Sequence, residues 1–194
     1  EIEKACPPLP QEFEVIADYK GASRPGFRSD YWTQGDWQVQ TYAWLRRNQA
    51  QGVPIAAGVL LYIDELSPGT DTIREMQSQI SRGDTDVRPE PGSEDEVILR
   101  NWRPGQSIDQ LSLGFRLRRA IRVIPVTEES LRTATAAFDG VVREIEENIE
   151  KEFAHGTISV AWSANCKDAN TCVACDFRHF CPTPGPNNTP TPVA

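Results

Sequence analysis

Residues 13–21 (Phe-Glu-Val-Ile-Ala-Asp-Tyr-Lys-Gly) restrict the possible folds more than any other stretch of the chain. Their valine, isoleucine and tyrosine side chains favour a strand, and the final glycine favours its end. Successive side chains of a strand point to opposite faces, so we expect Asp18 and Lys20 on one face, at the rim of a sheet. They are either a surface ion pair or part of a metal-dependent phosphodiesterase site. In such a site a carboxylate holds a Mg²⁺-type ion and a lysine orients the attacking water.

Strand-like and helix-like segments alternate along the rest of the chain, which predicts an α/β fold with a mixed central sheet flanked by helices. Residues 1–12 are expected to form a turn between two short extended pieces. Residues 82–110 read as irregular, with a short extended piece at 97–99. The predicted elements, from hydrophobic periodicity and capping residues, are a strand at 13–20, a helix at 36–50, a strand at 55–63, a helix at 70–81, a bulged strand at 113–125 and a helix at 127–153.

Length and composition predict one globular domain, because the chain has 194 residues of which 39% are hydrophobic. We place this domain at residues 1–182 and a disordered Pro-rich tail at 183–194. The chain starts with Glu1 close before a predicted strand, so we expect a natural N-terminal part to be missing. No apolar run approaches the ~20 residues of a membrane span and no secretory signal is visible, so we expect a cytoplasmic protein without a membrane partner.

The net charge of −8 argues against nonspecific electrostatic binding of nucleic acid, but it does not exclude a nuclease. Bound metal ions and local basic patches offset such a charge. The basic residues concentrate in one place, at Arg116, Arg118, Arg119 and Arg122.

Gln38 and Tyr42 lie on the helix predicted after the first strand, four residues apart and therefore on one helix face. Both side chains donate and accept hydrogen bonds. If they face the strand, they are able to orient the lysine, a metal-bound water or a phosphate. The alternative is that they form an ordinary polar edge of an amphipathic helix.

Four of the five cysteines lie within sixteen residues near the C-terminus. Cys172, Cys175 and Cys181 form a Cys-x2-Cys-x5-Cys pattern, which supplies three thiolates for zinc or an iron–sulfur cluster. The fourth ligand is Cys166, Cys6 or a residue outside the chain. We expect a structural staple rather than a catalytic metal, because no carboxylate–histidine pair accompanies the cysteines.

Taken together, Asp-Tyr-Lys-Gly, Gln-x3-Tyr and Cys-x2-Cys-x5-Cys-Pro resemble motifs of the PD-(D/E)xK nuclease superfamily. The resemblance is to the RecB-like branch, which includes the AddB nuclease domain and CRISPR-associated exonucleases with an iron–sulfur staple. It extends from about residue 13 to residue 182. It implies a restriction-endonuclease-like core with a Cys-rich C-terminal staple.

The resemblance also implies roles for individual residues. Asp18 would bind Mg²⁺ or Mn²⁺ together with the backbone carbonyl of Tyr19. Lys20 would position the nucleophilic water, and Gln38 and Tyr42 would be the supporting motif.

The metal and cluster ligands are less complete than in the family. The family has a further metal-binding aspartate in an upstream strand, for which Glu3 is the best-placed substitute here. Cys172, Cys175 and Cys181 would hold a [4Fe–4S] cluster, with Cys166 as a candidate fourth ligand and Zn²⁺ as the alternative to the cluster.

The implied function is metal-dependent hydrolysis of DNA, by an exonuclease rather than an endonuclease, in DNA repair. The expected substrate is DNA with a single-stranded end, and the expected protein partner is a helicase or a CRISPR-type protein. Two alternatives stay open from the residues themselves. One is a catalytically inactive nuclease-like domain kept for DNA binding or scaffolding, and the other is a zinc-stapled binding module.

Overall fold

The computed structural model describes residues 2–6, 8–9, 11–49, 53–106, 111–156, 161–162, 169–176 and 181. The chain divides into two compact units, residues 1–135 and residues 136–194. Within the described ranges, no helix combines the length and the apolar character that a membrane crossing requires.

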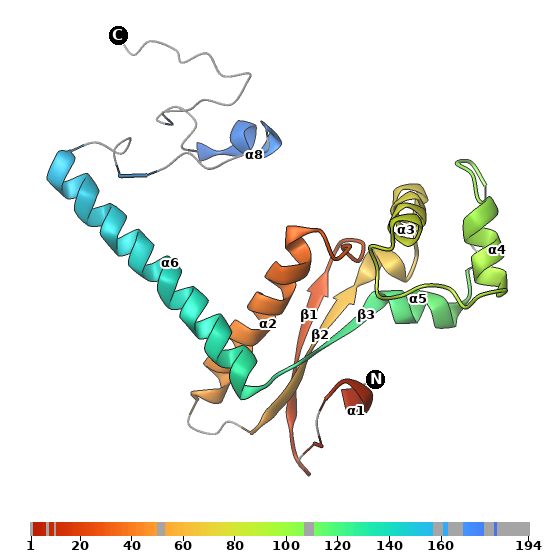
Figure 1. Cartoon of the computed structure of the whole chain (residues 1–194), viewed down its shortest axis with the longest axis horizontal. Coiled ribbons are helices and arrows are strands. Elements are labelled where there is room, and N and C mark those ends of the chain that lie inside the picture. The colour runs from red at the N-terminus through yellow and green to blue at the C-terminus, as the bar shows by residue number, and fades with distance from the viewer. Residues whose placement is uncertain are drawn as a thin grey trace, which may run out of the picture. The chain divides into compact units, whose positions relative to one another are not determined.

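The described part of the first unit is built on a small mixed sheet with the strand order β1-β2-β3 (Figure 1). Its strands are β1 (Glu14–Lys20), β2 (Ile55–Tyr62) and β3 (Ile121–Pro125). β1 runs parallel to β2, and β3 runs antiparallel to it. Lys20 pairs with Tyr62, and Ile121 pairs with Leu61, so β1 and β2 end at the rim where β3 begins.

Helix α2 (Asp30–Arg47) connects the two parallel strands and packs on the sheet through the buried side chains of Val39 and Ala43. Ser29 caps its first turn by accepting a hydrogen bond from the Tyr31 amide. The helix lies very close to β2 at Gly58, where a Cβ atom would be 1.9 Å from Cγ1 of Val39. A glycine at this position therefore sets how closely α2 approaches the sheet.

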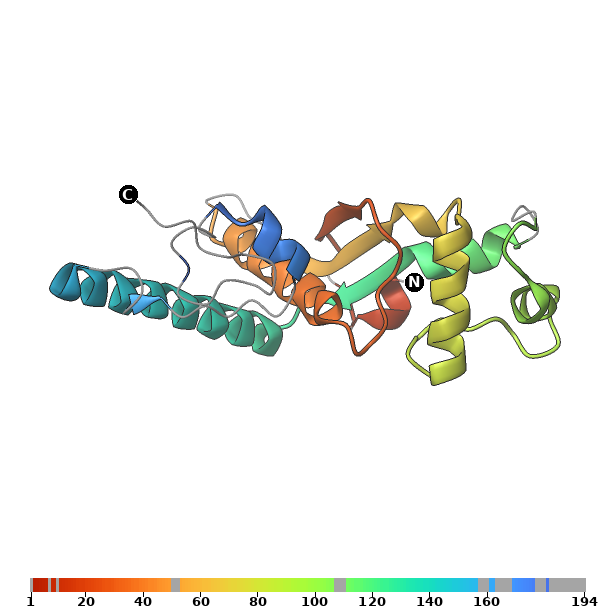
Figure 2. The same cartoon turned by 90° about the horizontal axis from the view of Figure 1, so that it is seen from above.

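The segment between β2 and β3 carries helices η1 (Ile63–Glu65), α3 (Thr70–Arg82), α4 (Glu94–Asn101) and α5 (Leu113–Ala120). Figure 2 shows α3 lying across the direction of the strands. A separate hydrophobic cluster joins these helices, formed by Ile73, Met76, Leu99, Trp102, Leu111 and Phe115.

Three further helices complete the described structure. Helix α1 (Ile2–Ala5) lies against β3. Helix α6 (Glu128–His155) starts in the first unit, where Leu131 packs with Ala43 and Ile55, and continues into the second. The second unit also holds α8 (Ala169–Ala174).

The predicted α/β class and the mixed sheet flanked by helices are confirmed, as are the strands at 13–20 and 55–63 and the helices at 70–81 and 127–153. The helix predicted at 36–50 begins six residues earlier, because Ser29 caps it and Gly35 lies inside it. Gly35 is buried against the sheet, and a Cβ there would meet Leu60 at 2.8 Å.

Three local predictions are wrong. Residues 1–12 contain α1 rather than two extended pieces, and residues 97–99 lie in α4. The strand predicted at 113–125 is helix α5 as far as Ala120, and only its last five residues form β3. For α4 and α5 the physical reason is capping, because the side chain of Ser93 accepts a hydrogen bond from the Glu96 amide at the start of α4, and that of Ser112 accepts one from the Phe115 amide at the start of α5. The tail predicted at 183–194 lies outside the described residues.

Candidate functional site

β1 places two of the candidate residues on the side of the sheet that α2 covers. Ile16 packs beside the cluster of Ala43 and Ile55, and alternation puts Asp18 and Lys20 on the same face as Ile16. The prediction that these two side chains share a face is confirmed by the 2.7 Å contact between Lys20 Nζ and Asp18 Oδ2.

α2 brings the two other candidates to this pair. Lys20 Nζ donates a hydrogen bond to Gln38 Oε1, and Gln38 Nε2 donates to the Tyr42 hydroxyl at 3.0 Å. Because the glutamine amide accepts from the lysine and donates to the tyrosine, its orientation is fixed from both ends. Asp18, Lys20, Gln38 and Tyr42 thus form one continuous row of polar contacts.

The row is partly open to solvent and leaves hydrogen-bonding capacity at Asp18. The side chains of Lys20 and Asp18 are 29% and 20% exposed. Asp18 Oδ2 is buried as an atom, and it accepts no hydrogen bond with acceptable geometry from the described residues. Its contact with Lys20 is therefore an ion pair alone, and a carboxylate oxygen with unused lone pairs is a suitable ligand for a hard cation.

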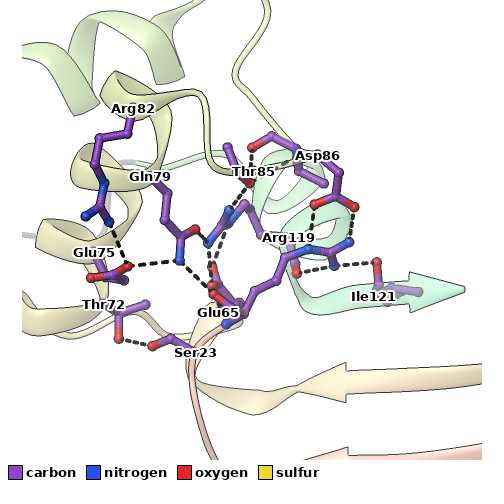
Figure 3. A network of polar contacts seen from close by, with 12 residues as sticks. Ser23, Glu65, Thr72, Glu75, Gln79, Arg82, Thr85, Asp86, Arg119 and Ile121 are labelled. Atoms are coloured by element: carbon purple, nitrogen blue, oxygen red, sulfur yellow. Dashed lines mark hydrogen bonds and ion pairs between the residues drawn. The ribbon is translucent and has the colours of Figure 1, made fainter. Parts of the chain in front are cut away.

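A buried polar network lies beside this site, at the rim where the strands meet the following loops (Figure 3). Glu65 and Arg119 are both 0% exposed. Arg119 donates to Oε2 of Glu65 at 3.1 Å and to Oε1 at 2.8 Å, and also to the Thr85 hydroxyl and the Gln79 amide oxygen. Each of the three nitrogens of this guanidinium therefore donates at least one hydrogen bond.

Arg24 connects the loop after β1 to the same network. Its amide donates to Glu65 at 2.8 Å, and its guanidinium donates to the carbonyls of Arg119 and Ile121 and to Asp86. The loop after β1, the turn after β2 and the start of β3 are thereby joined. The sequence shows the arginines around residue 119 as a basic concentration, but it gives no signal that their partners lie 28 to 95 residues away.

The metal ligands expected from the sequence are only partly assembled. In the described part of the chain, no group of three or more His, Cys, Asp or Glu side chains is placed to hold a metal ion. Glu3 is exposed on α1, and this helix lies against β3. β3 and β1 are the two opposite edge strands of the sheet, so Glu3 is not next to Asp18. The Tyr19 side chain is exposed on the other face of β1 from Asp18. Asp18 is thus the one carboxylate in the row.

The described cysteines lie in both units. Cys172 lies on α8 and accepts, through its carbonyl, a hydrogen bond from the Cys175 amide at 3.3 Å. Cys181 is described as a single residue, and Cys166 lies outside the described residues. In the first unit, the Cys6 thiol donates to the Ala56 carbonyl at 3.5 Å, and burial raises the pKa of this thiol.

No protein-family model matched the chain, and neither did any curated protein or solved structure. The geometry of the row and the motifs of the sequence are therefore the features that indicate a function.

Proposed function

We propose that this chain is a metal-dependent DNA nuclease domain of the RecB-like PD-(D/E)xK type, with a restriction-endonuclease-like core. The observation that supports this proposal is the row of contacts from Asp18 through Lys20 and Gln38 to Tyr42. Two motifs that are eighteen residues apart meet in it. The row lies near the carboxyl ends of two parallel strands, where α/β proteins commonly bind ligands.

Each residue of the row has a distinct task in phosphodiester hydrolysis. Asp18 is the ligand for a divalent ion, Mg²⁺ or Mn²⁺, which polarises the phosphate and lowers the pKa of the attacking water when bound. Lys20 holds a positive charge where negative charge develops on the phosphate. Gln38 and Tyr42 keep that ammonium group in place, because the amide oxygen accepts from it and the hydroxyl fixes the amide.

The remaining ligands of the expected sites are part of the same proposal. The carbonyl of Tyr19 and a further acid, for which Glu3 is the candidate of this chain, complete the metal site. Cys172, Cys175, Cys181 and Cys166 hold a [4Fe–4S] cluster, or alternatively Zn²⁺, as a structural staple. A brown protein with visible absorbance that is lost on chelation supports the cluster, and a colourless protein containing zinc supports the alternative.

A nuclease-like domain that binds DNA without cutting it is the second candidate. It is favoured by the single carboxylate in the row and by the absence of a three-ligand group among the described residues. A phosphodiesterase normally surrounds its ions with several oxygen ligands. In this case the row recognises a phosphate, and chemistry occurs elsewhere or not at all.

The test is cleavage of end-labelled single-stranded DNA with Mg²⁺ or Mn²⁺, with EDTA as the metal-free condition. Asp18→Asn and Lys20→Met are expected to lower the cleavage rate by about 10²–10³-fold or more. Asp71→Asn and Lys151→Met, which change an exposed aspartate and an exposed lysine outside the row, are the matched controls.

Cleavage that survives both Asp18→Asn and Lys20→Met contradicts the proposal. DNA binding without cleavage under every metal condition supports the domain that binds DNA without cutting it. Absence of both binding and cleavage excludes this function and the nuclease function alike. A circular single-stranded substrate distinguishes an exonuclease from an endonuclease, because an exonuclease needs a DNA end and leaves the circle intact.

A further inference from the structure

We propose that Phe27, Arg28 and Tyr31 form a stacking platform for an unpaired base of single-stranded DNA, next to the row of Asp18, Lys20, Gln38 and Tyr42. The inference deepens the proposed function, on which it rests, by assigning a binding subsite for the strand. It is carried by the exposure, the support and the position of these three side chains.

Two large aromatic side chains are presented to solvent within five residues. Tyr31 is 73% exposed and Phe27 is 45% exposed. A scattered exposed aromatic is common, but Phe27 in the turn before α2 and Tyr31 in the first turn of that helix offer apolar surface close together in the chain, to which another flat group can bind. Arg28 lies between them in sequence and is also exposed. Its guanidinium forms no ion pair or hydrogen bond with any described residue.

The turn is held rigidly, although its side chains are exposed. The Arg28 amide donates to Asp84 Oδ1 at 3.0 Å, and Gly26 is so close to Asp84 that a Cβ would lie 2.5 Å from Oδ2. The Ser29 amide donates to the Gly26 carbonyl at 3.1 Å, which closes the turn immediately before α2. The backbone before α2 therefore needs little ordering when a ligand binds, and this lowers the entropic cost of binding.

Phe27 is supported from behind by a second aromatic ring. Its ring meets Trp32 edge to face, with the centroids 4.9 Å apart and the planes at 79°. The Arg122 guanidinium stacks on the same Trp32 ring, 3.4 Å from its centroid. It also donates hydrogen bonds to the Trp32 carbonyl and to the Asp36 carboxylate, which hold it in place. Phe27 thus has one side packed on the protein, and much of the ring stays open to solvent.

Helix geometry connects the platform to the candidate site. Tyr31 precedes Gln38 by seven residues, which is close to two helical turns, so both side chains lie on one flank of α2. The distance along the helix is about 10 Å. A DNA single strand with one phosphate at Lys20 would therefore place a neighbouring nucleotide within reach of Tyr31.

An unpaired base fits this chemistry better than a duplex does. Stacking requires an accessible base face, which a base pair within a duplex does not offer to an aromatic side chain. Arg28 and the amino end of α2 attract the phosphate beside the base, and the Asp30 carboxylate in the first turn offsets part of that attraction. Affinity should therefore depend more on stacking than on charge, in agreement with a chain whose net charge is −8.

The experiment measures the anisotropy of a fluorescein-labelled oligo-dT bound by the full chain without added Mg²⁺ or Mn²⁺, so that the oligonucleotide stays intact. Tyr31→Ala and Phe27→Ala are each expected to weaken binding about 5- to 150-fold, the range for loss of one stacked base. Tyr31→Phe should retain the wild-type affinity, because the ring remains. Arg28→Gln should weaken binding and reduce the slope of log affinity against log salt by about one unit.

The controls separate stacking from unfolding and from nonspecific adhesion. Phe153→Ala removes a highly exposed aromatic from the second unit and should bind as the wild type does. Phe27→Leu keeps an apolar contact with Trp32, so a loss of binding in this variant with an unchanged melting temperature reports stacking. A duplex of the same sequence should bind at least tenfold more weakly than the single strand.

Unchanged affinity in both Tyr31→Ala and Phe27→Ala, or equal affinity for single strand and duplex, overturns the platform. If DNA is cut in an Asp18-dependent way while both variants bind normally, the platform is wrong and the proposed function stands. If the variants bind more weakly but the wild type never cuts, the platform is right and the nuclease assignment fails. A wild type that binds no oligonucleotide overturns the platform, and a protein segment is then the better candidate for these rings.

Discussion

Replacing Arg119 with methionine should destabilise the first unit strongly, because Glu65 would then remain as a buried charge without its cation. Both side chains are 0% exposed, and Arg119 supplies two hydrogen bonds to the carboxylate. After the replacement, the amide of Arg24 is the remaining donor to Glu65 among the described contacts. Removing one partner of a buried ion pair costs about 3–5 kcal/mol of unfolding free energy. This corresponds to a fall in melting temperature of about 6–20 °C.

A double-mutant cycle tests whether the pairing itself causes this cost. Glu65→Leu and Arg119→Met together remove both charges, so the double variant should be less destabilised than the sum of the single variants by about 1–3 kcal/mol. Urea unfolding followed by tryptophan fluorescence measures all four proteins. Arg74→Met is the matched control, since Arg74 pairs with Asp71 at the surface and should change stability by less than about 1 kcal/mol. Additive single effects, or a cost below about 1 kcal/mol for Arg119→Met, would refute the reasoning.

Three further changes have expected outcomes. The hydrogen bonds from Arg46 lower the pKa of Glu14, so this pair stabilises the fold above the ordinary glutamate pKa of about 4.3, and the contribution is lost as the pH falls through the lowered value. Glu14→Gln should remove this part of the acid-induced fall in melting temperature. Gly58→Ala should cost about 1–3 kcal/mol by overpacking, and Val39→Ala in the same molecule should recover part of it, as urea unfolding will show. Asp95→Ala should lower the free energy of unfolding by about 1–3 kcal/mol in the same assay, because the amide and hydroxyl of Ser112, which caps α5, both donate to the Asp95 carboxylate.

Local sequence patterns predicted the two pairs within the row, because the contacts inside each pair follow from regular geometry, but they did not predict the Lys20–Gln38 contact that joins the pairs. Alternation along a strand placed Asp18 beside Lys20, and the four-residue helical spacing placed Gln38 beside Tyr42. The buried network was beyond such reasoning. Arg119 meets Glu65 across 54 residues, and no local period marks an arginine that will be buried rather than exposed. Only the tertiary fold brings these two residues together.

The network and the candidate site occupy the same rim, which makes the position of the rim loops depend on buried charges. Arg24 and Glu65 follow β1 and β2, and Arg119 precedes β3, so one set of hydrogen bonds joins the three described strands at this rim. Apolar side chains of similar volume at positions 65 and 119 would restore stability. They would not fix the positions of the rim loops, because apolar contacts lack the directional hydrogen bonds of the buried ion pair. We therefore expect the Glu65→Leu/Arg119→Met double variant to bind oligo-dT more weakly than the wild type, even where its free energy of unfolding has recovered. Equal affinity in the double variant and the wild type would show instead that Asp84, which holds Arg28 directly, is sufficient to position the platform.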